Sequence, residues 1–208
     1  MSAYSADELR ALATLSGLVL PPALDPGWAT DDVPVADVVA LRGLLAHGAL
    51  TAGAEGTPTP TAAVRALLAP LTDPTTVLDL VGPAHRTVLA GDADTVRFVE
   101  REPDVWAVNR LGEPIDAVAR QLLHDATDDP TPVAGTGERA APRWRVRLAH
   151  RDAAWRWTLS GAEWAAGPRW RPLDAFADGA DEPGGYVPVS VAELRAELAA
   201  LVGGRLVA

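Results

Sequence analysis

The sequence predicts an α/β protein of the α+β type, in which antiparallel β-meanders are flanked by helices. Three observations support this fold class: helical spacing of apolar residues near the N-terminus, alternation of apolar and polar residues in two later regions, and a capped amphipathic helix in each of those regions. The later regions, at about 75–125 and 143–202, share the same order of elements. We therefore expect a single domain over residues 1–208 that contains two similar halves after its N-terminal helices.

The N-terminal segment, residues 5–72, contains three stretches in which leucine, valine and alanine recur at helical spacing. Ser5 and Glu8 form a capping box before the first stretch, and Pro60 takes the first helical position of the third. Glycines follow the first two stretches, where they readily terminate helices. The predicted helices cover residues 5–17, 35–48 and 59–73.

After the third helix the apolar period changes from 3.6 to 2, which predicts β-strands. The turn Gly91–Asp94 joins two of these strands into a hairpin, and Pro114 begins a helix that follows the first meander in the chain. Strands recur from Arg143, and Ser190 with Glu193 forms a second capping box before the last helix. The predicted strands are 77–80, 86–90, 95–100, 104–111, 143–150 and 154–159, followed by short segments near 163–166 and at 169–173, with polar loops at 125–142 and 174–185.

An alignment of the two halves predicts an internal two-fold repeat. It places Arg86–Ala90 over Arg145–Ala149 and Arg97 over Arg156. The alternative is the ordinary statistics of antiparallel strands in a chain rich in arginine, leucine and alanine.

Composition excludes several classes of function. The 208 residues include no cysteine, and all 18 basic residues are arginine. Thiol catalysis, cysteine metal sites, a Walker A lysine and a Schiff-base lysine are therefore excluded. No apolar run approaches the roughly 20 residues of a membrane helix, and the acidic, polar N-terminus does not resemble a signal peptide. We expect a cytoplasmic protein from a high-GC bacterium.

No pattern of side chains predicts catalysis or metal binding. The five serines include none in a GxSxG motif, and the acidic clusters lie in predicted turns. The histidines show no ligand spacing such as HExxH. They are His47, His85, His124 and His150. We therefore expect a non-enzymatic protein without a cofactor or metal; an enzyme whose site is assembled from scattered acidic residues is the third hypothesis.

Residues 143–171 hold five of the seven tryptophans and seven arginines, against two acidic residues, in a chain of net charge −10. Interleaved arginine and tryptophan are typical of sheets that bind single-stranded nucleic acid, which gives the alternative function. The alternation instead favours a tryptophan core face and an arginine solvent face. The predicted core residues are Trp144, Val146, Leu148, Trp155, Trp157 and Leu159, and the predicted exposed residues are Arg145, Arg147 and Arg156.

Several stretches of the chain resemble the EspG family of ESX secretion-associated proteins, which belong to high-GC actinobacteria. They are Leu41–Leu50, the helix ending at Leu67–Pro70, the strand Thr76–Leu80 and the meander that follows. The resemblance covers about residues 5–125 and, more loosely, the tryptophan-rich meander and the final helix. It implies antiparallel sheets related by a quasi-two-fold axis. It also implies a cytosolic chaperone of type VII secretion that covers a hydrophobic helical tip of its substrates, typically PE–PPE heterodimers.

The last helix is the predicted docking element for a helical protein partner. Its flanks carry alanines, and we expect Ala196 and Ala199 to contact the partner because small side chains allow another helix to approach closely. Asp92 and Asp94, in the hairpin turn, would lie beside this helix if the halves pack about a two-fold axis. We expect no membrane association and no nucleic-acid binding.

Overall fold

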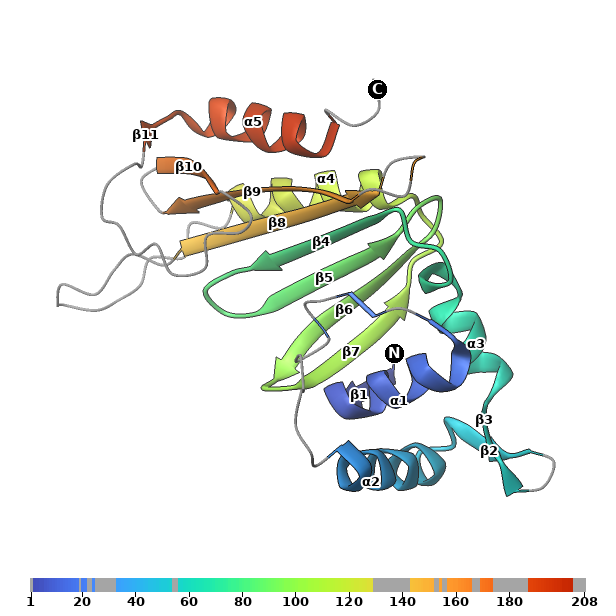
Figure 1. Cartoon of the computed structure of the whole chain (residues 1–208). Helices are drawn as coiled ribbons and strands as arrows, with labels where there is room; N and C mark the ends of the chain where they lie inside the picture. Colours follow the sequence, from blue (N-terminus) through green and yellow to red (C-terminus); the bar gives the residue numbers. More distant parts are fainter. Residues whose placement is uncertain are drawn as a thin grey trace, which may run out of the picture.

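One antiparallel sheet of nine strands organises the fold, with helices on both of its faces (Figure 1). The strand order is β1-β7-β6-β5-β4-β8-β9-β10-β11, and a separate two-stranded sheet, β2-β3, lies at one end. The computed structural model describes residues 2–18, 20–21, 24, 33–53, 56–128, 143–151, 154, 157–165, 169–173 and 187–203.

The elements have the following bounds. The helices are α1 (Ala6–Ser16), α2 (Val33–Ala46), α3 (Ala62–Leu68), α4 (Ile115–Asp128) and α5 (Val191–Gly203), with a 3-10 turn at Ala69–Leu71 after α3. The first strands are β1 (Ser2–Ser5), β2 (Leu50–Ala52), β3 (Pro58–Pro60), β4 (Thr76–Val81), β5 (Arg86–Gly91), β6 (Thr95–Glu102) and β7 (Val105–Arg110). The remaining strands are β8 (Arg143–Arg151), β9 (Trp157–Ala165), β10 (Arg169–Leu173) and β11 (Val187–Pro188).

The main sheet consists of two meanders joined at their first strands. β4 and β8 pair antiparallel from Thr76 opposite His150 to Val81 opposite Arg145. From this central pair β5 to β7 follow chain order outwards on one side and β9 to β11 on the other, and β1 lies beyond β7 at one edge. α4 or α5 follows each meander. The predicted α+β class with antiparallel meanders and flanking helices is therefore confirmed.

The predicted sequence repeat is not confirmed. The alignment of Arg86–Ala90 with Arg145–Ala149 places β5 over β8, whereas the strand order makes β4 the counterpart of β8. Arg156, the other aligned residue of the second half, lies outside the described residues. Matches of arginine, leucine and alanine between non-equivalent strands reflect the composition of the chain.

The two faces of the sheet bury separate hydrophobic clusters. Val88 and Phe98 belong to a cluster that also contains the apolar faces of α1, α2 and α3. Leu78 and Leu89 point the other way and pack with α4 and α5. In Figure 1, α1 lies between the sheet and α2, so α2 forms an outer layer.

Both predicted capping boxes are present. The Ser5 hydroxyl accepts a hydrogen bond from the Glu8 N–H (3.2 Å), and the Glu8 carboxylate accepts one from the Ser5 N–H (2.9 Å). Ser190 and Glu193 repeat this arrangement at 3.1 and 2.7 Å. Gly17, with φ of 66°, ends α1 in the left-handed conformation that favours glycine. Local sequence therefore determines where α1 and α5 begin and where α1 ends.

The third helix begins later than predicted. Pro60 lies in β3, opposite Leu50 of β2, and is buried there. Thr61 caps α3 instead, because its hydroxyl accepts a hydrogen bond from the Val64 N–H (3.4 Å). The fixed φ of proline suits a strand edge as well as a first helical position, so Pro60 did not distinguish the two.

The prediction for the second tryptophan-rich strand is wrong in its position and face. β9 pairs Ala162 with Val146 and Trp164 with Trp144, so Ala162 and Trp164 share the core face. Leu159 instead lies opposite Ala149 and is 39% exposed. Trp155, Arg156 and the Trp157 side chain lie outside the described residues.

The other predicted core residues of this region, Trp144, Val146 and Leu148, are buried, as expected. Arg145 and Arg147 lie on the opposite face but are half-buried rather than exposed. The reason is that acidic side chains lie beside them: Arg145 pairs with Glu163 at 3.5 Å, and Arg147 lies opposite Asp79 in register.

Trp144 and Trp164 form the aromatic centre of the second meander. Their rings stack at a centroid distance of 6.1 Å and an interplanar angle of 8°. A glycine at position 82 makes room for this pair, because a Cβ there would lie 2.3 Å from Trp144 Cζ3. The stack fixes the register of β8 against β9 directly beneath α5.

We expect Trp164→Ala to lower the free energy of unfolding by about 3–5 kcal/mol, because it empties a buried aromatic site. Leu159→Ala, on the exposed face of the same strand, is the matched control and should cost less than about 1 kcal/mol. Urea denaturation followed by circular dichroism measures both values. Equal costs for the two variants would contradict the assigned register.

Candidate partner-binding site

The turn between β5 and β6, which contains Asp92 and Asp94, is built into the fold. Gly91 has φ of 150°, and a Cβ there would lie 2.0 Å from the Asp94 carbonyl oxygen, so only glycine fits. The Asp92 carbonyl accepts a hydrogen bond from the Ile115 N–H at the start of α4 (2.9 Å). The turn therefore positions the N-terminus of α4.

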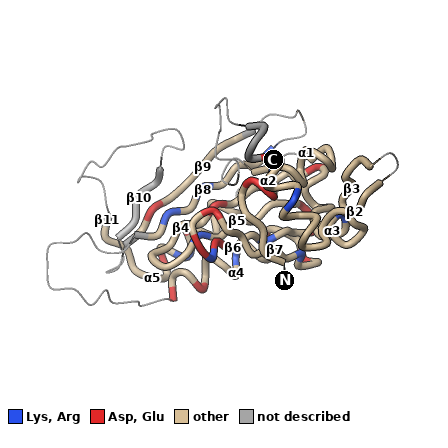
Figure 2. The backbone as a smooth tube through the Cα atoms, turned by 90° about the horizontal axis from the view of Figure 1, so that it is seen from below, with Lys and Arg blue, Asp and Glu red and all other residues tan. Residues whose placement is uncertain are grey.

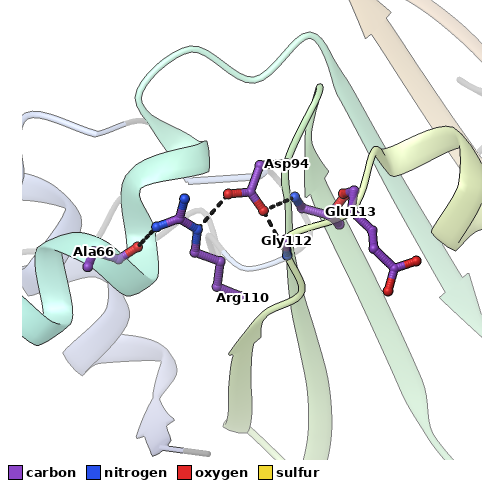
Figure 3. Close-up of polar contacts among 6 residues, drawn as sticks. Ala66, Asp94, Arg110, Gly112 and Glu113 are labelled. Carbon is purple, nitrogen blue, oxygen red and sulfur yellow. Dashed lines mark hydrogen bonds and ion pairs between the residues drawn. The ribbon is translucent and has the colours of Figure 1, made fainter.

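The Asp94 carboxylate connects this turn to two other elements (Figure 3). It accepts hydrogen bonds from the Thr95 N–H (2.8 Å), the Gly112 N–H (3.0 Å) and Arg110 Nε (2.5 Å). Arg110 also donates to the Ala66 carbonyl of α3 (3.0 Å). Asp94 is thus a structural residue that links β6, the loop before α4 and, through Arg110, α3.

The environment of Asp94 lowers its pKa. Burial alone would raise the pKa, but the hydrogen bonds from Arg110, the Thr95 N–H and the Gly112 N–H together outweigh it. The carboxylate is therefore held in its charged form, as its structural contacts require. Among the described residues, the hydrogen bonds of Asp92 and Asp94 run within the turn, to the start of α4 and the loop before it and, through Arg110, to α3.

A groove lies between α4 and α5, beside the predicted docking helix. Its volume is about 590 Å³. Apolar side chains of both helices, Leu123 and Leu198, lie at its base and are buried in the cluster under the two helices. The other lining residues are Ala117, Arg120, Gln121, His124, Arg195 and Ala199.

Polar contacts fix one end of the groove. Arg195 donates through Nε to the Thr127 hydroxyl (3.0 Å) and pairs through Nη2 with Asp128. His124 Nε2 lies 3.3 Å from the other carboxylate oxygen of Asp128. These contacts tie the C-terminal turn of α4 to the N-terminal half of α5 at this end of the groove.

The predicted docking residues differ in their positions. Ala199 lines the groove, while Ala196 is exposed on the outer side of α5, beyond the lining. Sequence reasoning missed the α4 wall, formed by Arg120, Gln121 and His124. The spacing of these residues shows only that they avoid the buried stripe of α4, and no local signal indicates that a second helix lies next to them.

In the described part of residues 143–171, the tryptophans and arginines make contacts that stabilise the sheet. Trp144 and Trp164 are buried against each other rather than presented as a stacking platform. Arg145 pairs with Glu163, and Arg86 binds Asp79 through two hydrogen bonds of 2.8 Å. In Figure 2, basic and acidic residues are interspersed along the central strands.

The histidines do not come together. His47 lies 3.6 Å from Glu8, and the His150 ring forms a hydrogen bond with the Thr76 hydroxyl (3.0 Å). Among the described residues, no group of three or more histidine or acidic side chains could hold a metal ion. Each helix in this part of the chain is also too short or too polar to span a bilayer.

No protein-family model matches the chain, and no curated protein matches it either.

We expect Asp94→Asn to lower the midpoint of urea unfolding at neutral pH, because it removes the charge that Arg110 and two N–H groups bind. Since the pKa of Asp94 is lowered in the folded state, its contribution is complete above the unfolded-state pKa of about 4 and is lost as the pH falls through the folded-state value. The difference between wild type and variant should therefore shrink below about pH 4.

Asp92→Asn is the matched control for this experiment. The Asp92 side chain makes none of the contacts described for Asp94, so the substitution should change stability by no more than about 0.5 kcal/mol. A difference between wild type and Asp94→Asn that stays constant down to pH 2 would contradict the charged role of Asp94.

Proposed function

We propose that this protein is a non-enzymatic, cytoplasmic chaperone-like protein that binds a helical secretion substrate of the PE–PPE type in a type VII secretion pathway. The observation that carries the proposal is the groove between α4 and α5. The resemblance of the sequence to the EspG family supplies the substrate class of the proposal, and the groove supplies the docking site.

The shape and chemistry of the groove support binding of a helical tip. Leucines at the base and alanines in the wall offer an apolar surface between longer polar side chains, which suits the aliphatic residues at the end of a helical hairpin. A volume of about 590 Å³ accommodates several such side chains. The hydrophobic tip of a secretion substrate would lose its contact with water there.

The charge of the groove favours a substrate that carries an acidic residue beside its hydrophobic tip. Arg120 and Arg195 line the groove in a chain whose net charge is −10. Asp128 already pairs with Arg195, whereas Arg120 has no ion-pair partner among the described residues. An acidic residue at the rim of the substrate's tip would pair with Arg120 and orient the substrate in the groove.

We expect Ala199→Arg to abolish co-elution with a PE–PPE heterodimer that co-elutes with the wild-type protein in size-exclusion chromatography. Arginine at this position fills the groove with a long charged side chain. Ala200→Arg is the matched control, because Ala200 is exposed on the same helix but does not line the groove. Both substitutions keep a good helix former, so the fold should persist.

Circular dichroism and thermal unfolding verify the fold of both variants. Co-elution that survives Ala199→Arg but is lost in Ala200→Arg would place the docking surface on the other flank of α5. If no PE–PPE heterodimer encoded near this protein's gene co-elutes with the wild type, the proposed substrate class is wrong.

We expect no binding of single-stranded DNA or RNA, even at low salt, in fluorescence anisotropy. The arginines of the central strands lie beside carboxylates, and the chain as a whole is acidic, so it repels a polyanion. Micromolar binding that weakens steeply with salt would instead support the nucleic-acid hypothesis, because such a slope reflects release of counterions from phosphates.

A further inference from the structure

The outer face of α2 exposes apolar side chains that a surface helix normally buries. Val38, Val39 and Leu45 are 48%, 63% and 47% exposed, and they are half of the six large hydrophobic residues exposed in the described chain. Ala40 and Leu44 of the same helix are buried against the first cluster, which contains α1. α2 is thus apolar on its inner and its outer side.

Such a helix differs from the usual surface helix, whose outward side is polar. The exposed residues follow helical spacing: Val38 and Leu45 lie two turns apart, and Val39 lies beside them on the outer surface. In Figure 1, no described element lies beyond α2 on this side. The outer face of α2 therefore has the pattern of a helix that packs against a partner.

Arg42 lies at the centre of this face. It is one turn from both Val38 and Leu45 on the side opposite Ala40 and Leu44. It is exposed and forms no ion pair with a described residue. A partner that covers the apolar face would bury the guanidinium, so it must supply a carboxylate at the same point.

The positive charge of Arg42 distinguishes between the partners that could cover the outer face of α2. In a second copy packed antiparallel about a two-fold axis, Arg42 would face Arg42 of the other copy at the crossing point, which is repulsive. An anionic membrane surface would repel the rest of the chain, whose net charge is −10. A helix with an acidic residue at the centre of an aliphatic stripe satisfies both the apolar side chains and Arg42.

We propose that the outer face of α2, formed by Val38, Val39, Arg42 and Leu45, binds an amphipathic helix of a second protein that carries an acidic side chain within its aliphatic stripe. This surface lies on the opposite side of the sheet from the groove between α4 and α5, because α2 belongs to the first hydrophobic cluster and α4 and α5 to the second. The inference is thus independent of the proposed function.

The test uses a fluorescein-labelled synthetic helix whose leucines recur at positions i, i+3, i+4 and i+7 around a central glutamate, and a second peptide with lysine in place of the glutamate. We expect the full-length protein to bind the glutamate peptide saturably in fluorescence anisotropy. The lysine peptide should bind at least about tenfold more weakly, because it places a like charge against Arg42.

Arg42→Glu should reverse this preference, with the lysine peptide now binding more tightly than the glutamate peptide. Val39→Glu should abolish binding of both peptides, whereas Ala199→Arg, in the groove on the other side of the sheet, should leave binding unchanged. Because all three positions are exposed, the variants should keep the wild-type thermal unfolding midpoint. Absence of PE–PPE co-elution with the wild-type protein, together with the expected peptide binding, would overturn the proposed function alone.

Three results would overturn the inference. The first is absence of peptide binding, or equal binding of both peptides by wild type and Arg42→Glu. The second is a wild-type dimer in light scattering that Val39→Glu converts to a monomer, which would make a second copy the occupant. The third is binding to phosphatidylglycerol vesicles that Val39→Glu abolishes, which would make the occupant a membrane.

Discussion

The antiparallel pairing of β4 with β8 is the constraint on which the rest of the structure depends. It joins two meanders into one sheet and brings Leu78 and Leu80 beside Val146 and Leu148, which together form the floor beneath α4 and α5. Without this pair each helix would cover only its own meander. The groove between the two helices exists because the sheet is continuous under both of them.

The opposite face of the same junction is charged. Asp79 of β4 binds Arg86 of β5 and lies opposite Arg147 of β8, and Arg86 also lies over the Trp106 ring at 5.8 Å. The hydrogen bond to Asp79 raises the pKa of Arg86, which burial would lower. These cross-strand charge pairs stabilise the central strands on the part of this face where polar residues replace the apolar contacts with α1 to α3.

Local signals in the sequence predicted the fold class and most of the elements. The features that the sequence analysis missed depend on contacts between distant segments. Ser5 and Ser190 cap their helices through residues three positions away, so four residues suffice to recognise each start. Leu159 was assigned to the wrong face because its orientation depends on pairing with β8, which no residue near it encodes. The strands β1, β2 and β3 are too short to show alternation.

The same distinction applies to the candidate site. The alanines of α5 were recognisable as a smooth flank, but Arg120 and Gln121 became part of a groove only because α4 and α5 lie side by side. Asp94 was noticed as an acidic turn residue and proved to be a structural link, since its partners Arg110 and Gly112 lie one strand further along the chain. Turn chemistry alone does not separate these two roles.

The place of β1 in the sheet has a consequence for biosynthesis. β1 pairs with β7, with Ser2 opposite Val108 and Ser5 opposite Val105, so it leaves the ribosome about a hundred residues before its partner. At a translation rate of about 5–20 residues per second, this delay is on the order of 5–20 s. The edge strand made earliest is thus completed late, and the nascent chain presents an unpaired β1 to proteases and chaperones until the first meander has been translated.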